Sequence, residues 1–189
     1  MPEIRPKAFL DFEASSLAQR SHPIEVAWVF EDGSFETFLI RPAPNWTDWA
    51  AEAEAIHGIP HETLISDGTA LEEVAARMMA RLAGHDLLAS APSWDGKWLS
   101  TLLRAAGQPR HALRLRDSDD AFREAAEAIL QDVVTGAELS ALVADILART
   151  EVPAGMPRAH RALPDAQAEW RRWLDVKAMA TKMAAEAGN

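Results

Sequence analysis

Two carboxylates, Asp11 and Glu13, end the short and mostly apolar run Lys7–Glu13. Such a run is typical of a buried strand that delivers polar groups at its C-terminal edge. Side chains two positions apart on a strand project from the same face, so both carboxylates can converge on one cation. Carboxylate oxygens suit a hard divalent metal such as Mg²⁺ or Mn²⁺. Two solvated acids at a strand end would give the same pattern, so the pair alone leaves both interpretations open.

Three further residues have types and positions that suit the same chemistry. Asp95 opens a predicted helix directly after another apolar strand, and a plain helix-start residue would look the same. His160 lies in a predicted loop, and Asp165 lies in the first turn of the helix that follows. By itself His160 is equally typical of a surface histidine. Taken together, the carboxylates can bind metal while the imidazole moves protons.

With these residues taken together, the sequence resembles the DEDDh exonucleases, which include the proofreading subunits of replicative DNA polymerases, oligoribonuclease and ribonuclease T. The resemblance covers nearly the whole chain and rests on three ordered motifs: Asp11-Phe12-Glu13, then Asp95, then His160 with Asp165. The family pattern His-x-Ala-x-x-Asp-Ala is matched at its fixed positions by His160, Ala162, Asp165 and Ala166. Weaker agreements are Ile24-Glu25 and Ile56-His57-Gly58-Ile59.

The resemblance implies a ribonuclease H-like fold, two divalent metal ions, Mg²⁺ or Mn²⁺, and removal of nucleotides from a 3′ end. Asp11 would bridge the two metals, and Glu13 and Asp165 would hold the metal that activates water. Asp95 would complete the cluster directly or through water, and His160 would act as the general base.

Two residues after Glu13 are candidates for contact with the substrate. Ser15, or a backbone N–H near it, would hold the 3′ hydroxyl, and Leu17 would pack against the terminal base. A turn residue and a core residue are the competing interpretations of these two positions.

The sequence also departs from the family pattern. After Glu13 the family usually has Thr or Ser residues ending in Gly, whereas Ala14-Ser15-Ser16-Leu17 contains no glycine. Before Asp95, Ser90 and Ala91 stand where many members have His-Asn, and Trp94 stands where Phe is common. We therefore expect substrate positioning to differ while the metal ligands are kept. The sister class that uses a tyrosine base is excluded, because the chain has 0 Tyr.

The amino-acid composition restricts the class of substrate and the cellular location that we expect. The 189 residues carry 19 Lys and Arg against 29 Asp and Glu, a formal charge of −10, which opposes accumulation of a long polyanion. We therefore expect single-stranded or short DNA or RNA with a free 3′ end. With 0 Cys, no disulfide or cysteine zinc site is possible. The absence of an apolar leader or spanning run predicts no membrane association and a cytoplasmic location.

The order of the predicted strands and helices that position these residues indicates a single α/β domain. We expect it to be an exonuclease domain over residues 1–189. We expect a mixed sheet, with its first three strands antiparallel and the later ones parallel, flanked by helices. The predicted strands are Lys7–Glu13, Ile24–Phe30, Phe35–Ile40, Asp86–Ala91 and Ala112–Leu115. The predicted helices are Thr47–His57, Leu71–Leu82 with a Thr69 cap and Glu72 in a capping box, Ser93–Ala106, Ala121–Thr150 divided at Gly136, and Asp165–Ala187 after a loop over Val152–Arg158.

The expected activity is metal-dependent 3′–5′ exonuclease hydrolysis to nucleoside 5′-monophosphates. Two alternatives stay open: a catalytically idle exonuclease-like module that binds nucleic acid or protein, and a phosphodiesterase acting on a small nucleotide. Retention of all four carboxylates and His160 argues against an idle module. A homodimer or a polymerase-like partner is a further expectation.

Overall fold

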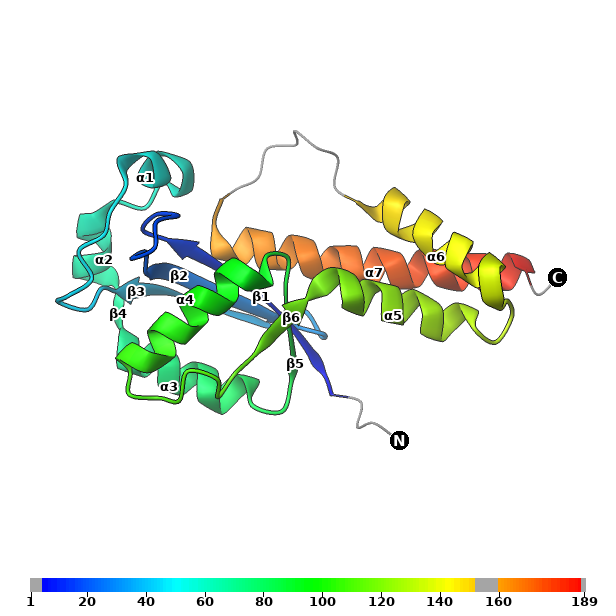
Figure 1. The fold of residues 1–189 in the computed structure, drawn as a ribbon, viewed down its shortest axis with the longest axis horizontal. Helices are drawn as coiled ribbons and strands as arrows, with labels where there is room; N and C mark the ends of the chain where they lie inside the picture. Colours follow the sequence, from blue (N-terminus) through cyan, green and yellow to red (C-terminus); the bar gives the residue numbers. More distant parts are fainter. Residues whose placement is uncertain (1–4, 152–159, 188–189) are drawn as a thin grey trace.

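The computed structural model describes residues 5–151 and 160–187, and within them the chain is built on a six-stranded sheet (Figure 1). The strands are β1 (Lys7–Ala14), β2 (Pro23–Phe30), β3 (Phe35–Arg41), β4 (Thr69–Ala70), β5 (Asp86–Ala89) and β6 (Leu115–Asp117). Their order across the sheet is β4-β3-β2-β1-β5-β6. β2 pairs antiparallel with both β1 and β3, and β5 pairs parallel with β1 and β6. The predicted mixed α/β sheet is confirmed.

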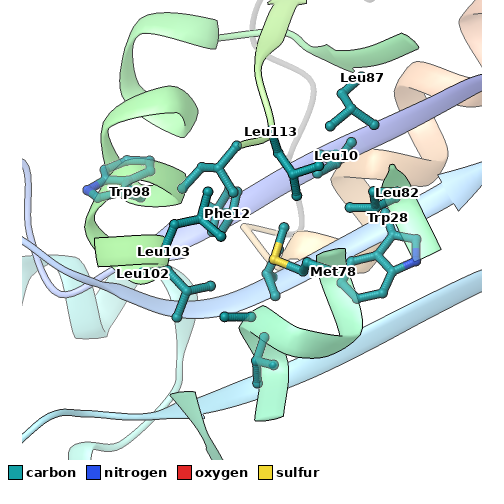
Figure 2. Close-up of a cluster of buried hydrophobic side chains, with 14 of the residues drawn as sticks. Leu10, Phe12, Trp28, Met78, Leu82, Leu87, Trp98, Leu102, Leu103 and Leu113 are labelled. Carbon is teal, nitrogen blue, oxygen red and sulfur yellow. The ribbon is translucent and has the colours of Figure 1, made fainter. Parts of the chain in front are cut away.

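Helices cover both faces of this sheet. They are α1 (Ala51–His57), α2 (His61–Asp67), α3 (Leu71–Leu82), α4 (Pro92–Ala105), α5 (Ser118–Leu130), α6 (Gly136–Thr150) and α7 (Ala162–Ala187). Figure 2 shows α3 and α4 packing on one face through the side chains labelled there, which include Leu10, Phe12, Trp28, Met78 and Leu102. Helices α5, α6 and α7 pack together against Phe9 and Leu88 on the other face.

The long helix α7 joins the sheet to a helical extension. Its first residues, including Ala162 and Ala166, pack on Ala27 and Val29 of β2. Figure 1 shows the rest of α7 running past the sheet beside α5 and α6. The start of α7 is therefore held over the sheet, while its later turns stabilise the helical extension.

Several predicted boundaries were wrong. The helix predicted from Thr47 begins only at Ala51, and it is followed by α2 and β4, at positions where no helix or strand was predicted. Ala70, not Thr69, is the N-cap of α3, and no side chain caps it, because Thr69 belongs to β4 beside Ile40. Thr69, which the capping-box pattern assigned to the helix, thus forms part of a strand pair instead.

Further differences lie in the second half of the chain. The strand predicted at Ala112–Leu115 is β6, displaced toward Asp117 because it pairs with β5 in the register Leu87↔Leu115. The helix division at Gly136 is confirmed, with φ +62 at this glycine. Helix α7 starts at Ala162, three positions before the predicted start. The predicted loop over Val152–Arg158 lies outside the described residues.

In the parts of the chain that the structure describes, no helix is both long enough and apolar enough to cross a membrane.

Candidate active site

Strand β1 aims Asp11 and Glu13 at the face of the sheet that α7 covers. Phe9 of the same strand contacts Phe122 and Trp173, at ring-centroid distances of 6.5 and 5.8 Å, on that face. Asp11 and Glu13 follow Phe9 at steps of two along the strand, so their side chains point the same way. The predicted sharing of one face by the two carboxylates is confirmed.

Asp165, in the first turn of α7, completes a group of three carboxylates. One oxygen from each of Asp11, Glu13 and Asp165 lies within 4.8 Å of the other two. The three residues come from the two ends of the chain, and they meet because the start of α7 packs on β2 next to β1. Three converging oxygen donors are a ligand set that suits Mg²⁺ or Mn²⁺.

Asp95 approaches the same group from α4. It lies in the first turn of the helix, follows β5, and is 2% exposed. Among the neighbouring charges, that of Asp95 contributes most to the raised pKa of Asp11. Asp95 is nevertheless outside the group of three oxygens that lie within 4.8 Å. Asp95 therefore acts on Asp11 through its charge, and it is not a fourth member of that group.

Burial and mutual repulsion favour the protonated forms of three of these carboxylates, although the charge of Arg161 partly offsets the effect at Glu13. Burial raises the pKa of Asp11 well above its usual range, and the charges of Asp95 and Glu13 add to the rise. Burial, followed by the charge of Asp165, raises the pKa of Glu13 to about 8. Burial raises the pKa of Asp95 to about 7, against backbone hydrogen bonds that lower it. Bound divalent cations would supply the charge that lets all of them ionise.

Glu25, for which no role was predicted, fixes the start of α7. It is 4% exposed on β2, and its carboxylate accepts hydrogen bonds from Arg161 Nε at 3.0 Å and Arg161 Nη2 at 2.6 Å. The backbone N–H of Ala162 donates to it at 3.0 Å. A single charged residue inside the apolar run Ile24–Phe30 was the signal available in the sequence.

His160 lies immediately before this anchored pair. It is exposed and has φ +46, the one non-glycine residue with positive φ in the described chain. It is not among the described residues whose ligand atoms form the metal-compatible group. The backbone conformation turns the chain at the residue before Arg161, so His160 stands at the entrance to α7 rather than among the carboxylates.

Glu169 is a further acidic residue at the site that sequence reasoning missed. Its charge acts on both Asp11 and Asp95. Its Oε2 accepts a hydrogen bond from Ser118 Oγ at 2.6 Å. The spacing of four from Asp165 places it one turn further along α7, which was a usable signal.

The two candidate substrate residues have contrasting environments. Ser15 is fully buried, and its hydroxyl donates to Asp48 Oδ2 at 2.9 Å. Leu17 is 71% exposed. Ser90 and Ala91, at the family's His-Asn positions, are both exposed just before α4. The side chain that is free to meet a ligand is therefore that of Leu17.

No protein-family model matches the sequence, and no curated protein matches it. Solved structures do match. Escherichia coli exonuclease I in complex with a dT13 oligonucleotide has a TM-score of 0.66 and 17% identity, covering 97% of this chain and 43% of that chain. The zinc-bound E. coli exonuclease I–ssDNA complex has a TM-score of 0.63 and 17% identity, covering 97% and 41%. The moderately thermophilic exonuclease I from Methylocaldum szegediense has a TM-score of 0.61 and 19% identity, covering 90% and 40%.

The chain has the fold found in exonuclease I. The identities of 17–19% establish similarity of fold, and the carboxylate cluster is compatible with divalent metal binding. The chain spans less than half the length of the exonuclease I proteins it matches.

Asp11→Asn is expected to stabilise the metal-free protein at pH 8. Raised carboxyl pKa values mean that the folded protein keeps protons that the unfolded chain releases, so this contribution to stability falls as pH rises from about 4.5 to about 8. Asparagine removes one repelling charge. The gain should be about 1 kcal/mol, or about 2–4 °C in Tm for a chain of this size, and smaller at pH 5.

Thermal unfolding in EDTA at pH 5 and pH 8 measures this effect. Mn²⁺ should raise the Tm of the wild type at pH 8 and raise that of Asp11→Asn less. Asp132→Asn, an exposed acid after α5, is the matched control and should not change Tm. A lower Tm for Asp11→Asn at pH 8 without metal would contradict the electrostatic account.

Glu25→Gln is expected to destabilise the fold by about 1–3 kcal/mol. The amide keeps the shape of the side chain but loses the charge that accepts from Arg161 and Ala162. Denaturant unfolding gives the free energy, with Glu62→Gln on exposed α2 as the control. A free energy of unfolding equal to that of the wild type would show that the start of α7 is held by packing alone.

Proposed function

We propose that this chain is a metal-dependent 3′–5′ exonuclease that hydrolyses single-stranded or short nucleic acid to nucleoside 5′-monophosphates. The observation that carries the proposal is the convergence of Asp11, Glu13 and Asp165, with ligand oxygens within 4.8 Å and Asp95 beside them. The exonuclease I fold supports it, and the neighbours were crystallised with single-stranded DNA. In this proposal residues 1–189 act as one exonuclease domain.

In this proposal two divalent ions, Mg²⁺ or Mn²⁺, would be held by Asp11, Glu13 and Asp165, and Asp95 would complete the cluster directly or through water. All four donors are carboxylates, and burial with mutual repulsion raises the pKa values of Asp11, Glu13 and Asp95. Bound metal of this kind supplies positive charge to the scissile phosphate and acidifies the attacking water. The carboxylates must ionise to bind the metal. Loss of metal binding is therefore sufficient to make activity fall at acid pH.

His160 has the role of general base in this proposal. A neutral imidazole nitrogen would accept the proton that the attacking water loses. The exposed position of His160 next to the anchored Arg161 leaves the ring free to reach a bound substrate. Attack on phosphorus then expels the 3′ oxygen of the preceding sugar, which leaves the phosphate on the released nucleoside as a 5′-monophosphate.

Substrate contacts in this proposal come from the segment that follows Glu13. Leu17, 71% exposed, packs against the terminal base, and a backbone N–H near the buried Ser15 serves the 3′ hydroxyl. The net charge of −10 limits the number of phosphates that the protein can hold, which favours single-stranded or short DNA or RNA. We further propose a cytoplasmic location, and a homodimer or a polymerase-like subunit as partner.

The decisive experiment is cleavage of a 5′-labelled single strand with Mn²⁺. We expect a ladder that shortens one nucleotide at a time from the 3′ end, nucleoside 5′-monophosphate as product, and complete loss of cleavage with EDTA. Asp11→Asn should lower the rate by roughly 10²-fold or more, because it removes a metal ligand charge. Asp132→Asn should leave the rate unchanged.

Three results would contradict the proposal in different ways. Binding without cleavage would indicate an idle module, and cleavage of a dinucleotide or cyclic nucleotide alone would indicate a small-molecule phosphodiesterase. Equal digestion of a circular single strand would indicate an endonuclease.

His160→Ala is expected to keep metal binding and lose roughly 10²- to 10⁴-fold in kcat, the contribution of a positioned general base. The comparison is made with His111→Ala, whose exposed side chain lies in the loop before β6. An unchanged kcat for His160→Ala would assign the base to another group.

A further inference from the structure

The segment 15–22, which contains Leu17, is held at its first residues by hydrogen bonds to Asp48. It leaves β1 directly after Glu13 and Ala14 and returns at Ser21 and His22 to β2. The hydroxyls of Ser15 and Ser16 both donate to Asp48 Oδ2, at 2.9 and 2.5 Å. Ser16 Oγ also accepts from the backbone N–H of Ala18 at 3.0 Å.

Lys97 of α4 holds the later residues of the same segment by hydrogen bonds. Its ammonium donates to the backbone oxygen of Ala18 at 2.7 Å and to Ser21 Oγ at 2.9 Å. The indole of Trp98 donates to the same Ser21 Oγ at 3.0 Å. The Lys97 ammonium also lies 4.9 Å from the ring centroid of Trp94. Both of its hydrogen-bond acceptors are neutral oxygens of the segment, so these bonds fix the position of the segment. The Lys97 charge also acts on Asp48 and helps to lower the pKa of that carboxyl.

These contacts join the two elements that carry the carboxylates. The segment begins two positions after Glu13 on β1, and Lys97 lies two positions after Asp95 on α4. Between the two sets of bonds stands Leu17, with 71% of its side chain exposed. The exposed side chain of Leu17 thus belongs to a segment that hydrogen bonds to Asp48 and from Lys97 hold at its two ends.

We propose that Lys97, acting through Ala18 and Ser21, is a positioning residue that sets the affinity for the 3′-terminal nucleotide. The inference rests on the proposed exonuclease function and deepens it. Lys97 fixes the place of Leu17 relative to the carboxylates, so that the terminal base meets a preformed apolar contact. Ser21 transmits the effect, because it accepts from both Lys97 and Trp98.

Loss of this connection is expected to weaken substrate binding while chemistry continues. Lys97 donates to the segment and not to Asp11, Glu13 or Asp165, so the ionised site and the proton transfer stay as they are. A mobile Leu17 must be ordered at each binding event, which raises KM. Lys97→Met removes both hydrogen bonds and the charge. Ser21→Ala removes only the shared acceptor.

The experiment compares kcat and KM for a short single strand across four variants. Lys97→Met should raise KM by about 10-fold, the effect of losing a hydrogen bond to a charged group, with kcat within a factor of about 2. Ser21→Ala, which keeps the bond from Lys97 to Ala18, should raise KM by a smaller factor. Lys97→Arg keeps a charged donor and should restore most of the affinity. Lys182→Met, which changes an exposed lysine of α7, is the matched control and should leave both constants unchanged.

Hydrogen exchange of the amides between Ser15 and His22 gives a readout that does not need activity. Exchange should accelerate in Lys97→Met and Ser21→Ala and stay at the wild-type rate in Lys182→Met. Unchanged exchange, or a fall in kcat with KM unchanged, would overturn the positioning role. A rise in KM for Lys97→Met but not for Ser21→Ala would also overturn it, since the effect would then come from charge. An inactive wild type would refute the exonuclease function, and the exchange rates would still decide whether Lys97 orders the segment.

Discussion

The bond between the Glu25 carboxylate and the start of α7 is the contact on which the candidate site depends. Glu25 is buried on β2, next to β1, and accepts from the Arg161 guanidinium and the Ala162 amide. These bonds hold the first turn of a 26-residue helix at the sheet. Asp165 meets Asp11 and Glu13 because of this placement. A shift of that helix start would separate the metal-compatible oxygens and would also disturb the packing of Ala162 and Ala166 on β2.

The same geometry that gathers the carboxylates makes them mutually repulsive. Burial and neighbouring charge raise the pKa values of Asp11, Glu13 and Asp95, so in metal-free protein the cluster retains protons near neutral pH. A fold can keep such a group only where packing elsewhere outweighs it. Here two apolar layers, α3 with α4 and α5 with α6 and α7, enclose the sheet on both faces. The cluster, which is compatible with divalent metal binding, is therefore kept at a cost in stability.

Local patterns predicted most elements but failed where pairing at the edges of the sheet decided them. Apolar runs located β1, β2, β3 and β5, and helical spacing located α3 and α4 within a residue or two. Thr69 followed by Glu72 matches a capping box, yet Thr69 pairs with Ile40 instead. Short strands such as β4 and β6 contain too few residues to show a period, so only their partners define them.

The sequence by itself determined which residues are candidates for chemistry, since residue types and order single out Asp11, Glu13, Asp95, His160 and Asp165. Strand alternation also determined that the first two share a face. Only the tertiary structure decided which groups meet: it brought Asp165 to within 4.8 Å of the first pair, set Asp95 beside Asp11, and left His160 exposed. It also supplied Glu25, Glu169 and Lys97, whose partners lie tens of residues away. Such contacts arise from packing between distant segments, which no local periodicity encodes.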